Sequence, residues 1–390
     1  MEDNAAGMRS FGCGQYSSLR TWLGTALHRI WYLSPEPAAL ARILRALRVT
    51  SVLYDRLSQR RRQRARLSGA CRRLPVPVIS VGNLVVGGTG KTPLTMWLAD
   101  HLQGQGITVA VLSRGYGRSS KGVAQVVVTP DLAAAARQFG DEPTLMATKL
   151  STSPVWVGRQ RIQSGKAAIK ESGAQLLILD DGYQHWGLDR DLDLVLVDAK
   201  MPWGNGHLLP LGPLREPVEH LDRADAIVIT HWEGNPENCL ELRDQLQQRF
   251  PTKPLFACRF HPARPRWGLD GSSLPRELVN RHPAVVFAGI AKPDPFFQVA
   301  REMGVHSALN LRFADHHYYQ PTDLARILAP VLAGEAHWLL TTEKDAVRLP
   351  ASVRDLVATV AVELDFGEDH VRFLDYLKQW WQGMQPPRKR

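Results

Sequence analysis

The 390-residue chain is roughly two to three times as long as a typical domain, so we expect two packed units and an additional segment rather than one small module. Hydrophobic residues at 44% and charged residues at 22% exclude a mainly disordered chain and a polytopic membrane protein. Fourteen arginines against four acidic residues place the whole net charge of +10 in residues 1–75, and the rest of the chain is neutral.

The basic front end contains two helical patterns, over residues 17–33 and 40–47, followed by an arginine-rich run over 56–73. One interpretation is a helical hairpin packed on the body with a solvated basic linker. The other is a helix lying in the plane of an anionic membrane, which two tryptophans beside an arginine-rich face favour. A membrane-spanning helix is disfavoured, because Arg20 and Arg29 interrupt the one long apolar stretch.

A phosphate-binding loop follows the first buried strand. Residues 76–81 predict that strand, a glycine-rich loop leads into Gly-Lys-Thr, and a helical stretch continues to Leu102. This order is typical of a P-loop, in which Lys91 contacts the β- and γ-phosphates and Thr92 holds Mg²⁺. Valine at position 85 replaces the usual first glycine. The expected phosphate-binding residues are Gly87, Gly88, Thr89, Gly90, Lys91 and Thr92.

A second apolar strand, residues 176–179, ends in Asp180 and Asp181. A strand with this ending is typical of a Walker B motif, whose carboxylate binds Mg²⁺. In a regular strand adjacent side chains point to opposite faces, so at most one of the two is ideally placed for the metal. An acidic turn is the alternative, but the P-loop upstream favours the metal site.

Five further strands alternate with helical segments, which predicts an α/β fold with a mostly parallel sheet covered on both faces. The expected strands are Ile107–Leu112, Val126–Val128, Val155–Val157, Leu194–Val197 and Ala226–Ile229. Ligands bind at the carboxyl ends of such strands. The loop 113–118 and the two aspartates both fall at that edge.

Five prolines between Pro251 and Pro275 mark a boundary, after which a second, smaller α/β unit begins. We expect strands over 284–290 and 338–342 and helices over 294–303 and 369–382. The predicted organisation is an amphipathic, basic docking segment (1–74), a P-loop core (75–262) and a smaller C-terminal α/β domain (263–390). Taken alone, His316 and His317 after Asp315 indicate a capping turn more than a metal or base site.

Eight motifs between residues 75 and 349 together resemble the tetraacyldisaccharide 4'-kinase family, whose members phosphorylate a lipid A precursor in Gram-negative bacteria. They are VPVISVGNLVVGGTGKTP, LSRGYGR, GDEP, LDDGYQH, GNGHLLPLGPLREP, FAGIAKPDPFF, FADHHYY and TTEKDAVRL. The unusual glycine loop is similar to the family's own form. The resemblance covers nearly the whole chain.

This resemblance implies transfer of the γ-phosphoryl group of ATP, with Mg²⁺, to the 4'-hydroxyl of a tetraacylated glucosamine disaccharide 1-phosphate, giving lipid IVA. It implies that Asp141 and His316 activate the hydroxyl. It also implies that Lys91 and Asp181 act on the phosphates, with Thr92, Asp180 and Asp181 in the metal region. Positions with less certain roles near the substrate are Arg161, Arg215 and Glu216.

The expected location is the cytoplasmic face of the bacterial inner membrane, as a peripheral or monotopic protein, because an acylated substrate stays in the bilayer. Four scattered cysteines fit a reducing compartment, and no secretory signal is expected. The expected partners are the lipid substrate and an anionic membrane surface, with no nucleic acid and no obligate protein partner. The alternative function is a P-loop ATPase switch or metallochaperone, which hydrolyses ATP without lipid.

Overall fold

The computed structural model describes residues 30–31, 41–67, 72–232, 236–269 and 271–384. The predicted helix over 17–33 lies outside the described residues, except for 30–31. None of the helices in these ranges combines the length and the apolar character needed to cross a bilayer.

The larger sheet has eight strands in the order β3-β4-β2-β5-β1-β6-β7-β8. All neighbours pair in parallel except the edge strand β3, which is antiparallel to β4. The strands are β1 Val78–Asn83, β2 Val109–Ser113, β3 Ala124–Gln125, β4 Val155–Val157, β5 Leu176–Asp180, β6 Leu192–Asp198, β7 Ala226–Thr230 and β8 Leu255–Ala257. The predicted α/β class is therefore confirmed. The strand predicted over 126–128 is wrong, because Val127 and Val128 are exposed just beyond β3.

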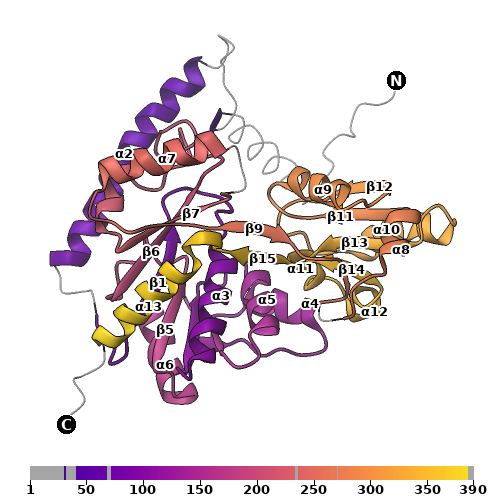
Figure 1. The fold of residues 1–390 in the computed structure, drawn as a ribbon, viewed down its shortest axis with the longest axis horizontal. Coiled ribbons are helices and arrows are strands. Elements are labelled where there is room, and N and C mark those ends of the chain that lie inside the picture. The colour runs from indigo at the N-terminus through magenta and orange to yellow at the C-terminus, as the bar shows by residue number, and fades with distance from the viewer. Residues whose placement is uncertain (1–29, 32–40, 68–71, 233–235, 270, 385–390) are drawn as a thin grey trace, which may run out of the picture.

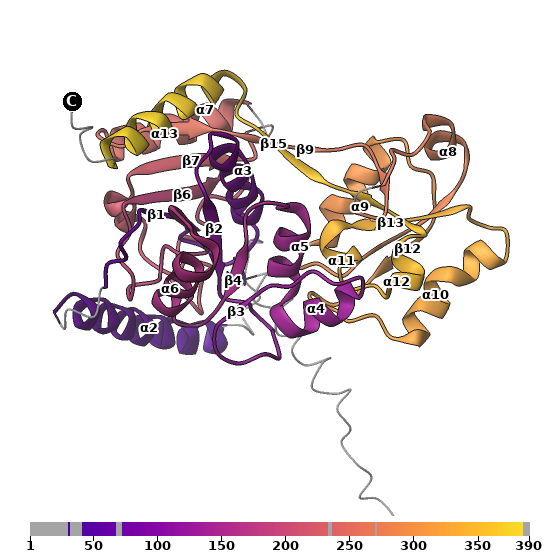
Figure 2. The same ribbon diagram turned by 90° about the horizontal axis from the view of Figure 1, so that it is seen from below.

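Helices cover both faces of this sheet (Figures 1 and 2). One face packs against α3, α4 and α5, and the other against α6, η2 and α7. Their bounds are α3 Lys91–Gly104, α4 Leu132–Phe139, α5 Asp141–Lys149, α6 Arg161–Ser172, η2 Val218–Arg223 and α7 Pro236–Arg249. Because both faces are buried, the strands read as continuous apolar runs rather than alternating ones.

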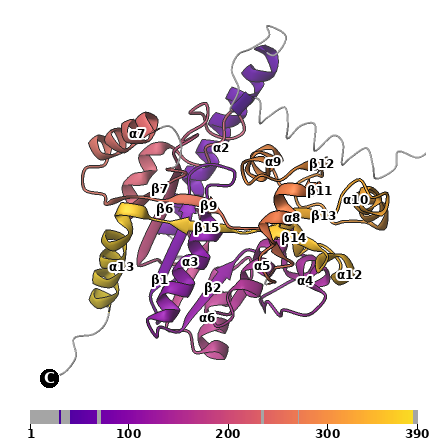
Figure 3. The same cartoon turned by 45° about the vertical axis from the view of Figure 1, so that its right-hand side comes forward.

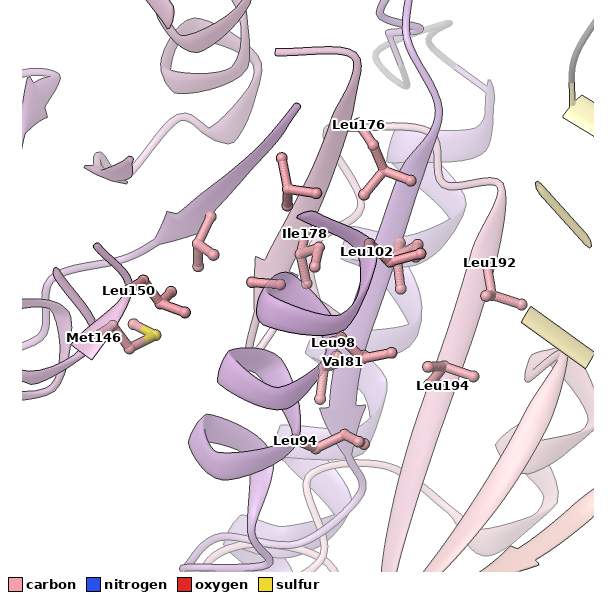
Figure 4. Packing of buried hydrophobic residues seen from close by; sticks show 14 of the residues in the cluster. Val81, Leu94, Leu98, Leu102, Met146, Leu150, Leu176, Ile178, Leu192 and Leu194 are labelled. Atoms are coloured by element: carbon pink, nitrogen blue, oxygen red, sulfur yellow. The ribbon is translucent and has the colours of Figure 1, made fainter. Parts of the chain in front are cut away.

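The contact between α3 and the sheet fixes the helix that follows the phosphate loop. Leu94, Leu98 and Leu102 recur one helical turn apart and are almost fully buried. They pack on side chains of β1 and β5, including Val81 and Ile178 (Figure 4). The first turn of α3 is thereby held at the carboxyl edge of the sheet.

The second sheet has five strands in the order β10-β14-β13-β11-β12, with only β10 antiparallel to its neighbour. Two apolar clusters, one on each side, join it to its helices. The strands are β10 Arg266–Trp267, β11 Ala284–Ala288, β12 Ser307–Arg312, β13 Trp338–Thr342 and β14 Val357–Val360. The helices are α8 Arg276–Arg281, α9 Pro293–Glu302, α10 Pro321–Leu332, α11 Glu343–Ala346 and α12 Ala351–Arg354.

Two antiparallel strands, β9 (Arg259–Pro262) and β15 (Val362–Asp365), connect the two sheets (Figure 3). After β15 and the short turn η3 (Gly367–Asp369), helix α13 (His370–Met384) returns to the larger sheet. Its Phe373 and Leu377 are buried in the same cluster as α3. The last helix of the expected unit 263–390 therefore packs on the larger sheet and not on the second one. The boundary near residue 262 remains a proposal.

Helix α2 (Ala41–Leu67) runs without a break through part of the arginine run, which one of the two interpretations treated as a solvated linker. Arginine has a high helix propensity, so the run continues the helix. Ser51, Tyr54 and Arg62 bind residues 208–216 of the core. The opposite face carries the exposed side chains of Val49, Val52, Leu53 and Leu57, with Arg56 and Arg60 among them.

Candidate active site

The loop between β1 and α3 brings Lys91 to the carboxyl edge of the sheet. Gly90 precedes the helix with φ 86°, and a Cβ at this position would lie 2.0 Å from the ring of Phe260, so only glycine fits. Lys91 Nζ lies 3.2 Å from Asn83 Oδ1 and 3.4 Å from the Gly87 carbonyl oxygen. The Asn83 side chain in turn donates to Thr89 Oγ1. The backbone N–H groups at the start of α3, together with the Lys91 ammonium, form a site suited to an anion.

Asp180 is buried at the end of β5. Its Oδ2 accepts a 3.4 Å hydrogen bond from Ser113, and its Oδ1 has no hydrogen-bond partner within the described residues. Burial, helped by the negative charges of Glu142 and Asp181, raises the pKa of Asp180 to about 7. An unpartnered buried carboxylate oxygen is energetically costly unless a cation or a proton binds it.

Asp181 adopts a left-handed conformation, φ 52°, so the strand ends at Asp180 and does not stay regular. Its two carboxylate oxygens each accept a 2.9 Å hydrogen bond from Arg215, and one lies 3.6 Å from Lys91 Nζ. Burial would raise the pKa of Asp181, but Lys91 and Arg215 outweigh it and hold the pKa below its ordinary value. The strand therefore ends in one carboxylate with an unpartnered oxygen and one that is ion-paired.

The residues fit a magnesium ion at this edge. Mg²⁺ is usually held by one or two protein oxygens, with waters and substrate phosphates completing its shell. The Asp180 Oδ1 atom is such an oxygen, and the Thr92 hydroxyl lies in the first turn of α3. Among the described residues no group of three or more His, Cys, Asp or Glu side chains is placed to hold a metal, so an all-protein cage is not part of this site.

Asp141 and His316, which are 175 residues apart, lie in direct contact. Asp141 starts α5 and is buried, and its Oδ2 lies 2.7 Å from His316 Nδ1. The other oxygen, Oδ1, accepts the Glu142 backbone N–H. His316 has φ 58°, a strained conformation for a residue with a side chain, and its side chain is partly exposed. The loop after β12 thus meets the P-loop core here.

Two cations that we did not predict join this contact. Lys344 Nζ binds Glu142 Oε1 at 3.0 Å, and the buried Arg348 guanidinium lies 3.8 Å from Asp141 Oδ2. Burial would raise the pKa of Asp141, but the His316 hydrogen bond and these two positive charges hold it below its ordinary value. Both residues stand in the motif TTEKDAVRL, the only signal for them in the sequence.

The three expected substrate residues lie in different surroundings. Arg161, at the start of α6, is buried and donates to the Gly158 carbonyl, and its Nε has no hydrogen-bond partner among the residues that the structure describes. Burial lowers its pKa to about 10. Arg215 is bound to Asp181. The Glu216 carboxylate contacts instead Arg62 of α2 at 3.5 Å, His220 at 2.8 Å and Arg223 at 2.9 Å. Its substrate role remains a prediction.

We expect Glu216→Gln to lower the free energy of unfolding by about 3 kcal/mol at pH 7, because it leaves the half-buried guanidinium groups of Arg62 and Arg223 without their buried counter-charge. The pKa of Glu216 is held below its ordinary value by His220 and Arg223 in spite of burial. Its stabilising effect is therefore present above the unfolded pKa and lost as pH falls through the lower folded value. Urea unfolding at pH 7 and below pH 4 measures this, with exposed Glu219→Gln as the control. An unchanged midpoint at pH 7 contradicts the buried role.

Three features stand at one edge of a parallel α/β sheet: a glycine loop between β1 and α3, a lysine at the start of that helix, and carboxylates at the end of the adjacent β5. Together they define a P-loop protein of the phosphoryl-transfer class. A family model described as tetraacyldisaccharide-1-P 4'-kinase matches residues 43–381. The chain belongs to this family.

Relatives and a solved structure agree with this assignment. The chain is 45% identical over 374 residues to a tetraacyldisaccharide 4'-kinase of Syntrophobacter fumaroxidans, covering 96% of this chain and 97% of that protein. It is 37% identical to one of Desulfatibacillum aliphaticivorans, covering 85% and 91%. The structure of LpxK from Aquifex aeolicus, an "apo" form in complex with ATP, superimposes with a TM-score of 0.70 at 30% identity, covering 88% of this chain and 99% of that chain.

Proposed function

We propose that this chain is a lipid kinase that transfers the γ-phosphoryl group of ATP to the 4'-hydroxyl of a tetraacylated glucosamine disaccharide 1-phosphate, yielding lipid IVA for lipid A biosynthesis. Membership in the kinase family supports the reaction. The observation that carries it is the contact between Asp141 of the P-loop core and His316 of the second unit, because it adds a base to a phosphate-binding loop.

The phosphate loop binds ATP, the donor of the phosphoryl group. Backbone N–H groups around Gly87–Gly90 and the ammonium of Lys91 bind the β- and γ-phosphates and neutralise the charge that moves to the leaving oxygen. Asp181 orients Lys91 and Arg215 through the ion pairs described above. Thr92 and Asp180 are the residues that would hold Mg²⁺, which would supply positive charge to neutralise the phosphate oxygens.

The base acts on the acceptor. Asp141 accepts the Nδ1–H of His316, which leaves Nε2 as the nitrogen that takes the proton from the 4'-hydroxyl. The hydroxyl oxygen bonds to the γ-phosphorus, the bond from that phosphorus to the β,γ-bridging oxygen breaks, and ADP leaves. Asp141, with its low pKa, remains ionised and stabilises the imidazolium. Glu142 lies between the metal region and the base: its negative charge acts on Asp180, and its carboxylate accepts a hydrogen bond from Lys344.

Transfer of label from γ-labelled ATP to a lipid A disaccharide precursor in detergent micelles tests this proposal. We expect labelled lipid in an amount equal to the ADP formed, and little ADP without the lipid. Fast hydrolysis that does not need lipid, with no labelled lipid, would support an ATPase switch or metallochaperone instead.

We further propose that the protein docks peripherally on the cytoplasmic face of the inner membrane. The exposed face of α2 carries the four apolar side chains Val49, Val52, Leu53 and Leu57, and arginines lie on the same face. Apolar side chains enter the lipid interface while each basic residue near anionic lipid adds roughly 1 kcal/mol. Docking through this face would place the enzyme at the bilayer in which an acylated substrate stays.

A chain truncated to begin at residue 74 is expected to lose most of its binding to anionic vesicles in a flotation assay. Binding by the full chain should fall steeply with salt, because the Debye length shortens to about 3 Å at 1 M, and leave a salt-resistant remainder from the apolar side chains. Zwitterionic vesicles are the control. Undiminished flotation of the truncated chain would show that the front end is only structural.

A further inference from the structure

Tyr116 exposes a large aromatic ring beside the base. The residue is 72% exposed, and it is the one aromatic among the exposed large hydrophobic side chains of the described residues. Its ring centroid lies 5.6 Å from that of His316, with the two ring planes inclined by 45°. An exposed aromatic side chain at the edge of a reaction site is a typical element of a ligand surface.

The backbone fixes the position of this ring. Tyr116 stands between two left-handed glycines, Gly115 with φ 67° and Gly117 with φ 72°, in the turn after β2. A Cβ on Gly115 would lie 2.8 Å from the Phe139 carbonyl oxygen, and one on Gly140 would lie 3.0 Å from the Tyr116 carbonyl oxygen. The turn is therefore packed against the residues that immediately precede Asp141. The ring and the base are held by the same short stretch of chain.

The reacting hydroxyl must lie near this ring. With Nδ1 bound to Asp141, His316 receives the proton at Nε2, so the hydroxyl oxygen lies about 3 Å from that atom. The sugar ring that carries the hydroxyl then lies next to the imidazole, within reach of the Tyr116 ring. A glucosamine pyranose presents axial C–H groups on a flat face, and such a face packs on an aromatic face and removes apolar surface from water.

We propose that Tyr116 is a positioning residue that stacks on the glucosamine ring bearing the acceptor hydroxyl and orients that hydroxyl toward His316 Nε2. The inference rests on the proposed kinase function and adds to it the residue that recognises the sugar. Because Tyr116 contacts the acceptor and not the nucleotide, its loss affects the use of lipid and leaves the affinity for ATP unchanged.

Two variants test the stacking surface, Tyr116→Ala and Tyr116→Phe, with label transfer measured against lipid mole fraction in mixed micelles and, separately, against ATP. We expect the alanine variant to raise the apparent KM for lipid about tenfold and to lower kcat severalfold, at an unchanged KM for ATP. The phenylalanine variant keeps the aromatic face and should retain activity within about twofold. Equal thermal midpoints are expected for all three proteins, because the side chain is exposed.

Three outcomes would overturn the proposal while the wild type remains an active lipid kinase. They are a normal KM for lipid in the alanine variant, an equal loss in the phenylalanine variant, and a matching rise in the KM for ATP. A wild-type protein that labels no lipid would instead overturn the proposed function itself. The two failures are therefore distinguishable.

Discussion

Replacing Lys91 with methionine is expected to lower the turnover of the lipid kinase reaction by at least about 1000-fold. The ammonium lies at the start of α3, 3.6 Å from Asp181 Oδ1, where we propose that it neutralises charge on the phosphates. Methionine keeps the length and the apolar stem of the side chain but removes the charge. The fold should survive, because the α3 packing through Leu94, Leu98 and Leu102 is untouched.

Label transfer under saturating lipid, together with a thermal unfolding curve, measures this effect. Lys166→Met is the matched control, because Lys166 is an exposed lysine on α6 and should tolerate the same substitution. A folded Lys91→Met protein that retains near-normal kinase activity would contradict the assignment of the nucleotide site.

Removing either half of the Asp141–His316 contact is expected to depress kcat strongly, and removing both should be little worse than removing one. The two side chains share one hydrogen bond of 2.7 Å, and in the proposed mechanism they act on one proton, so we expect their losses not to be additive. Each single substitution to alanine should lower kcat by about 100-fold or more. The measurement is kcat for both single variants and the double variant at saturating ATP and lipid.

The neighbouring residue provides a control of the same chemical type. His317 Nε2 lies 2.8 Å from Asp323 Oδ2, a local histidine–carboxylate pair at the start of α10. His317→Ala removes an equivalent pair from the same loop and should leave most of the activity. Fully multiplicative losses in the Asp141 and His316 series, or a His316→Ala enzyme at the wild-type rate, would refute the shared base.

The parts of the molecule that local patterns determine were predictable. A short run of residues of characteristic type and order predicts each of three parts: the strand before the phosphate loop, the helix after it, and the two carboxylates at the end of β5. Likewise, β4 and β13 occur at the predicted residues. The resemblance to the kinase family identified Asp141 and His316 as a pair. No local pattern could do so, because the two residues are 175 positions apart in the sequence.

Packing partners were not predictable in the same way. The apolar face of α13 indicates that the helix is buried but not which sheet it covers, and it packs on the first sheet through Phe373. The sequence of the arginine run in α2 is compatible with a linker as well as with a helix. The structure shows a helix, in which Arg62 contacts Glu216 of the core. Lys344 and Arg348 act across the junction of the two units, so no local pattern assigns them to Asp141.

We infer that phosphate moves from ATP to one hydroxyl of the acceptor disaccharide, and the position of the new phosphate in the product identifies that hydroxyl. The purified protein is incubated with ATP, Mg²⁺ and a tetraacylated disaccharide 1-phosphate, and the product is analysed by mass spectrometry and phosphorus NMR. We expect one added phosphate, bonded at the 4' position, and no product from an acceptor that lacks the 4'-hydroxyl. Phosphate at another position, or ADP and free phosphate with an unchanged lipid, would contradict a 4'-kinase activity.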